Sequence, residues 1–68
     1  MNLHAVVSTN VLAVGYDPVA QTLRVQFRGG GLYDYFGVAP DVFEQMLRPN
    51  PWRRIGRLVM AHRYFKAA

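Results

Sequence analysis

Arginine and lysine side chains gather near the C-terminal end of this chain, where they could bind phosphate groups. Six of the eight basic residues lie between positions 48 and 66, namely Arg48, Arg53, Arg54, Arg57, Arg63 and Lys66. The four acidic residues all precede them, at Asp17, Asp34, Asp41 and Glu44. The net charge is +4, and its uneven distribution favours an anionic partner for the C-terminal segment. A solvated helix face that keeps a small protein in solution explains the same pattern equally well.

A second group of side chains suited to nucleic acid lies on the expected central strands. Arg24 and Arg28 share one face of the alternating segment 22–28, and Phe36 is expected on the same side of the sheet. Cations bind phosphates and an exposed aromatic ring stacks on bases, although an ordinary solvent face fits too. The candidate nucleic-acid-binding residues are therefore Arg24, Arg28, Phe36, Arg53, Arg54, Arg57, Arg63 and Lys66.

Tyr33 and Tyr35 could form a stacking platform, since aromatic side chains on a sheet bind unpaired bases in this way. The expected strand pairing instead favours the core for both rings, with their hydroxyls reaching its rim. Trp52 has the same two interpretations, a stacking surface or an anchor for the last helix, and we favour the anchor.

Catalysis is not expected. Residues 8–10 offer two hydroxyls without a nearby histidine and acid pair, and such residues more often form turns. The glycines at 29–31 lack the lysine and the strand-to-helix setting of a phosphate loop. There is no cysteine, and His4 and His62 are too far apart to build a metal site alone. We expect no catalytic residue, metal or cofactor, and no small-molecule substrate.

The expected sheet has three strands. Residues 11–16 form the first, and a loop at 18–21 pairs Tyr16 with Leu23, Val14 with Val25, and Leu12 with Phe27, so every pair is apolar. For the next hairpin a two-residue loop would bury Asp34 without a partner. A three-residue loop at 29–31 turns Asp34 outward near Arg24 and Arg28, and pairs Tyr33 with Phe27 and Tyr35 with Val25.

Two helices follow the strands. Pro40 begins the first, and Pro49 ends it. Asn50 is the expected cap of a second helix that runs from about Pro51 to Lys66, with an apolar stripe of Trp52, Ile55, Val59, His62 and Phe65. The fold class is α+β: a three-stranded antiparallel β-meander followed by two C-terminal helices packed on one sheet face (β-β-β-α-α).

An ordered set of motifs resembles a known family. The motifs are Val7-Ser8-Thr9-Asn10, Val14-Gly15-Tyr16-Asp17, the strand residues Leu23, Val25 and Phe27, then Gly31, Tyr33, Asp34, Tyr35, Val38, Pro40, Val42, Phe43 and the late Tyr64. Together they resemble the KTSC domain over residues 7–65, within one domain at 1–68. The signature positions expected to be structural are Gly15, Tyr16, Asp17, Phe27, Tyr33, Tyr35, Pro40, Phe43 and Tyr64.

The resemblance implies a fold of this kind and, from the occurrence of such domains in lysyl-tRNA synthetases, RNA as a partner. Residues 48–55 depart from the serine- and glycine-containing stretch that the family usually has before its last helix. We therefore expect a small non-enzymatic binding module that engages RNA, either tRNA or a single strand, through arginines.

Two alternatives remain open at this point. A protein-interaction or self-association module is suggested by the aromatic residues Trp52, Phe36 and Phe65. A basic and apolar last helix could instead lie on a membrane surface. No apolar run is long enough to span a membrane and no signal peptide is visible, so a cytoplasmic location is expected.

Overall fold

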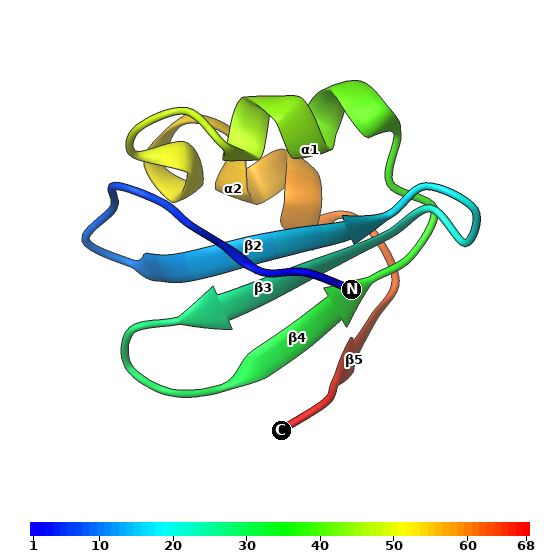
Figure 1. Cartoon of the computed structure of the whole chain (residues 1–68), viewed down its shortest axis with the longest axis horizontal. Helices are drawn as coiled ribbons and strands as arrows, with labels where there is room; N and C mark the ends of the chain where they lie inside the picture. The colour runs from blue at the N-terminus through cyan, green and yellow to red at the C-terminus, as the bar shows by residue number, and fades with distance from the viewer.

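The computed structural model describes residues 1–68 as one five-stranded sheet with two helices over one face (Figure 1). The strands follow the chain in the order β1-β2-β3-β4-β5, and every neighbouring pair is antiparallel. The elements are β1 (His4–Ala5), β2 (Val11–Asp17), β3 (Thr22–Phe27), β4 (Leu32–Tyr35), α1 (Pro40–Met46), α2 (Pro51–Met60) and β5 (Tyr64–Lys66).

The α+β class and the helices on one face agree with the sequence-based prediction, but the predicted strand count of three was wrong. The three predicted strands are β2, β3 and β4, and a short strand lies beyond each end of this meander. The sequence predicts no element for the segment that forms β1. It predicts that the second helix continues through the segment that forms β5.

The second helix ends at Met60 rather than at Lys66. The Nδ1–H of His62 donates to the carbonyls of Leu58 and Val59, at 2.9 and 3.2 Å, and so satisfies carbonyls that the next helical turn would otherwise use. The chain then turns and pairs with β4 from Tyr64 onward. The helical spacing of His62 and Phe65 was therefore a coincidence, and Phe65 is 61% exposed.

The first hairpin pairs Tyr16 with Leu23 and Val14 with Val25, as predicted, but Phe27 pairs with Val11 instead of Leu12. An irregularity between Val11 and Ala13 adds one residue to β2. Such a bulge lets Val11 enter the core and leaves Leu12 exposed, because the extra residue reverses the side-chain alternation at that point.

The second hairpin has the predicted loop length and the predicted faces, but its strands pair two residues away from the predicted register. Tyr33 pairs with Val25 and Tyr35 with Leu23, and the loop is 28–30, because the N–H of Phe27 donates to the carbonyl of Gly31. Gly30 and Gly31 both have positive φ, at 102° and 100°, which glycine adopts readily. A shift of two keeps every side chain on its predicted face.

The hydrophobic core lies between the sheet and the helices. Its buried residues are Val6, Val11, Val14, Leu23, Val25, Tyr35, Val38, Met46 and Val59. The opposite face of the sheet has no helix over it (Figure 1). There the N-terminal segment crosses β2 so closely that a Cβ on Gly15 would lie 2.6 Å from the carbonyl oxygen of Asn2, so only glycine fits at this crossing.

Candidate functional site

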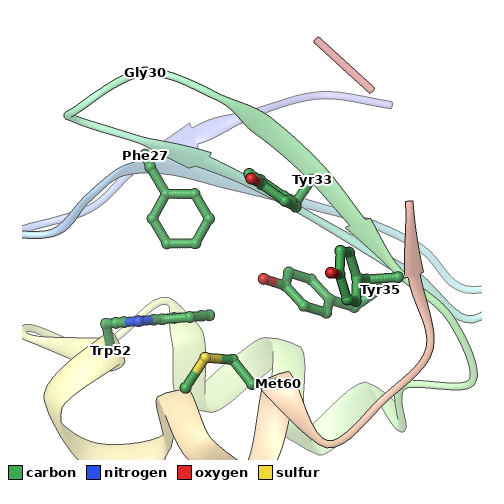
Figure 2. A pocket seen from close by; sticks show the side chains of 7 residues that line it. Phe27, Gly30, Tyr33, Tyr35, Trp52 and Met60 are labelled. Carbon is green, nitrogen blue, oxygen red and sulfur yellow. The ribbon is translucent and has the colours of Figure 1, made fainter. Parts of the chain in front are cut away.

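An aromatic groove of about 510 Å³ opens between the sheet and α2. Figure 2 shows Phe27, Tyr33 and Tyr35 on its sheet side, with Trp52 and Met60 opposite them on α2. The lining residues are Phe27, Gly30, Tyr33, Tyr35, Trp52, Met60 and Tyr64. Five of the seven are aromatic and none carries a charge, so the groove offers flat ring faces without a fixed charge inside it.

The strand pairing explains the sheet side of the groove. Tyr33 and Tyr35 lie two residues apart on β4 and therefore point to the same face, where Phe27 of β3 also lies. β5 then brings Tyr64 directly opposite Tyr35, and paired residues of neighbouring strands share a face. Three consecutive strands thus contribute one continuous aromatic surface.

The helix side depends on Gly56. Trp52, Gly56 and Met60 follow one another at intervals of four residues, so they lie along one side of α2. A Cβ on Gly56 would lie 3.0 Å from Cδ2 of the Trp52 indole. The absent side chain therefore lets the indole lie against the helix and present itself to the sheet.

Close aromatic contacts hold the rings in place. Phe27 meets Trp52 edge to face with centroids 4.9 Å apart, and it meets Tyr33 edge to face at 5.6 Å. Tyr64 lies 5.9 Å from Tyr33 and 6.0 Å from Tyr35. These separations are those of favourable aromatic pairs, so the groove is preformed by packing among its own walls.

The tyrosine hydroxyls supply the polar groups of the groove. Tyr35 is only 5% exposed, and its ring forms part of the core. Burial raises the pKa of its hydroxyl above the ordinary tyrosine value, and the neighbouring Tyr33 and Tyr64 raise it further. The hydroxyl therefore stays protonated at neutral pH and can both donate and accept a hydrogen bond.

Cations lie around this uncharged groove. Lys66 Nζ is 5.9 Å from the centroid of the Tyr33 ring. On α2, the exposed Arg57 precedes the groove-lining Met60 by three residues, and the exposed Arg53 precedes Gly56 by three, so both arginines lie next to the groove side of the helix. None of these cations has an acidic partner, since the chain's one ion pair lies elsewhere. We call Arg53, Arg57 and Lys66 the cationic rim.

The remaining predicted binding residues are not brought together with this rim. Arg24 lies on the uncovered face of the sheet and donates two hydrogen bonds to Asp34, at 2.7 and 2.9 Å, which raise its pKa above the ordinary arginine value. Arg28 donates to the carbonyl of Ser8 at 2.8 Å. Arg54 donates to the carbonyl of Gln45 in α1 and to that of Pro49 in the connection between the two helices. These three arginines are thus engaged within the protein.

Two further candidates lie at the edge of the uncovered face. Phe36 is partly exposed, and its N–H donates to the carbonyl of Arg63, an exposed residue. The eight candidates therefore do not form one surface, because the sheet separates Arg24 and Phe36 from the cationic rim. Sequence reasoning missed Tyr64 and Met60 as groove residues. The adjacent β-prone pair Tyr64-Phe65 was the signal that favoured a strand.

The signature residues outside the groove make contacts within the first hairpin and with α1. The hydroxyl of Tyr16 donates to the carbonyl of Val38, and its ring stacks on Phe43 of α1 at 5.1 Å. Burial, with smaller contributions from Asp41 and Asp17, raises the pKa of this hydroxyl. Asp17 accepts the N–H groups of Val19 and Ala20 at the turn. Pro40 begins α1. These contacts fasten the first hairpin to α1.

Two classes of site have no counterpart in the structure. No group of three or more His, Asp or Glu side chains is placed so that it could hold a metal ion. Neither helix has the length and apolar character needed to cross a membrane.

Comparison with known proteins matches this sequence and fold to one family. The KTSC domain model matches residues 7–50. A protein of Tsukamurella paurometabola is 42% identical over 45 residues, covering 66% of this chain and 67% of that protein. An uncharacterised protein of Stutzerimonas stutzeri is 39% identical over 46 residues, covering 68% and 65%.

The structural match extends over the whole domain. The crystal structure of a KTSC domain protein from Yersinia pestis superposes with a TM-score of 0.88 at 26% identity, covering 98% of this chain and 97% of that one. The family model ends at Asn50, so the α2 and β5 sides of the groove lie beyond the residues that it matches. Sequence and structure together show that the chain belongs to the KTSC domain family.

Proposed function

We propose that this domain is a non-enzymatic module that binds single-stranded nucleic acid, RNA in particular, in the aromatic groove. The observation that supports the proposal most is the combination of five uncharged aromatic walls with a rim of cations that have no acidic partner. Aromatic faces stack on bases, and arginine and lysine bind the phosphates that connect them. Both parts of a single-strand site thus lie side by side.

The shape of the groove favours a single strand over a duplex. A base can reach the ring faces between the sheet and α2 only when it leaves the base stack. In a duplex the bases are stacked and paired, and the backbone would meet only the rim. The proposal therefore predicts tighter binding to unpaired RNA, including the loops and ends of tRNA, than to duplex DNA.

The test measures fluorescence anisotropy of labelled single-stranded RNA, single-stranded DNA, tRNA and duplex DNA at about 50 and 200 mM salt, a range over which phosphate-driven binding weakens strongly. The triple variant R53Q/R57Q/K66Q should bind weakly and show a shallower salt dependence. The matched control compares the single variants R48Q and R57Q, because both arginines are exposed but Arg48 lies in the turn after α1, whereas Arg57 lies on α2 three residues before the groove-lining Met60. Equal binding by the triple variant and the unmodified protein would overturn the proposal.

Self-association is the second candidate function, and the exposed strand β5 is the observation that favours it. β5 forms one edge of the sheet, its three residues are all exposed, and Phe65 projects from it. An edge strand offers unpaired backbone groups to another chain. Sedimentation over a wide concentration range tests this candidate, and a constant monomer mass would count against it.

The membrane-surface alternative requires a longer basic helix than α2. It depended on a basic amphipathic helix that continues to Lys66, whereas α2 ends at Met60. The apolar side of α2 packs into the core through the fully buried Val59.

A further inference from the structure

Tyr35 combines deep burial with a hydroxyl that has no partner in the protein. Its side chain is 5% exposed and lines the groove, yet no hydrogen bond within the protein involves the hydroxyl. No polar side-chain atom is both fully buried and unpartnered, so the Tyr35 hydroxyl opens onto the groove. Tyr16 shows the contrasting case, because its hydroxyl donates to the carbonyl of Val38. In the free protein, water can therefore satisfy this hydroxyl. A ligand that displaces that water from the groove must offer a polar atom in its place, because buried polar groups normally have partners.

We propose that the Tyr35 hydroxyl hydrogen-bonds the polar edge of one unpaired nucleobase held between the aromatic walls of the groove. This inference rests on the proposed function and names the part of the nucleic acid that the groove takes. A base is a flat ring with polar atoms around its edge, which matches flat aromatic walls that surround a hydroxyl. A purely apolar ring would leave the hydroxyl without a partner, at a cost in free energy.

The hydrogen-bonding chemistry of a hydroxyl predicts which property of a base determines whether the groove binds it. A tyrosine O–H donates to a carbonyl oxygen or ring nitrogen and accepts from an amino group, and it rotates to suit either. It can therefore pair with the edge of any of the four bases, provided that another base does not already occupy that edge. The groove should thus select unpaired bases and tolerate their identity.

The cationic rim places the rest of the nucleotide. Lys66 lies beside Tyr33 on the β5 side, and Arg57 lies beside Met60 on the α2 side. Phosphates on either side of the bound base can therefore reach cations without entering the groove. Affinity then has a phosphate part from the rim and a base part from the groove, and the two parts can be separated by mutation.

The test compares Y35F with Y16F, which removes the same atom outside the groove. Binding is measured to oligouridine, oligoadenosine and an oligomer of abasic nucleotides of equal length, and stability is measured by urea unfolding. Y35F should fold as stably as the unmodified protein, because its hydroxyl has no internal partner. It should bind both base-containing oligomers about 2- to 10-fold more weakly, the usual range for one lost hydrogen bond, and bind the abasic oligomer unchanged.

Y16F should show the opposite result, a loss of stability with unchanged binding. Unchanged binding of Y35F to oligouridine and oligoadenosine would overturn the inference, as would equal binding of base-containing and abasic oligomers by the unmodified protein. A strong preference for one base would contradict the predicted tolerance. Failure of the proposed function would give a different result from failure of this inference. In that case R53Q/R57Q/K66Q would bind all three oligomers with the same affinity as the unmodified protein does.

Discussion

Arg24 and Asp34 face each other across β3 and β4, and the guanidinium donates from Nε and Nη2 to the two carboxylate oxygens at 2.7 and 2.9 Å. The pair lies on the uncovered side of the sheet, where Asp34 is nevertheless buried. Because each charge is compensated inside the protein, Arg24 is a poor phosphate ligand. The pair instead holds two central strands in register.

Replacing Arg24 by Gln should therefore lower stability and leave binding intact. The substitution leaves the Asp34 carboxylate buried without its charged partner, which should cost about 1–3 kcal/mol. Urea unfolding measures the loss, and the double variant R24Q/D34N should recover part of it because the unpaired charge is gone. Weakened RNA binding by folded R24Q would assign the interface to the uncovered face instead of the groove.

The correct faces of β3 and β4 followed from the sequence, and the reason is physical. A buried, unpaired Asp34 is costly, so any acceptable register places it outward and Tyr33 and Tyr35 inward. That argument has a period of two residues, so it could not distinguish the observed pairing from one two residues away. The choice between them depended on which glycines of 29–31 adopt positive φ, and three identical residues carry no such information.

The groove itself could not be predicted for a different reason. Its sheet side follows from the alternation of Phe27, Tyr33 and Tyr35, and its helix side from Trp52 and Gly56. Its third wall requires Tyr64 to lie on a strand. No glycine or proline separates α2 from Tyr64 and Phe65, so the sequence does not mark where the helix ends. The helix ends where His62 caps it and where the following residues pair with the open edge of β4, and both features exist only in the folded chain.

Replacing Gly56 by Ala should move the Trp52 indole. The new Cβ would lie 3.0 to 3.2 Å from three atoms of a rigid ring, and the ring must shift to admit it. Alanine gains about 1 kcal/mol of helix propensity, which offsets part of the packing cost, so stability should change little while binding weakens. The change is visible in fluorescence, because Trp52 is the only tryptophan. An unchanged emission spectrum with unchanged affinity would show that the position of the Trp52 indole does not depend on Gly56.

Alkaline pH should destabilise the fold through its tyrosines. Burial raises the pKa of Tyr16 and of Tyr35 in the folded state, so both ionise more easily in the unfolded chain. Their contribution to stability is complete below the ordinary tyrosine pKa of about 10 and is lost as the pH rises through their higher folded values. Absorbance of tyrosinate against pH, combined with urea unfolding, checks this, and Y35F should remove one late-ionising group. Ionisation of Tyr16 and Tyr35 at the ordinary tyrosine pKa in the folded protein would contradict it.

Tyr64 and Phe65 provide a matched pair that separates the two sides of the sheet. They are neighbours on β5 with similar exposure, 63% and 61%, but Tyr64 pairs with Tyr35 in the groove and Phe65 pairs with Asp34 on the uncovered face. Y64A should weaken binding to single-stranded RNA about 5- to 150-fold, the effect of losing one base–aromatic stack of roughly 1–3 kcal/mol, whereas F65A should bind normally. Both variants should stay folded, because neither side chain is buried. Anisotropy with the same RNA measures both, and a greater loss in F65A than in Y64A would move the binding surface to the other side of the sheet.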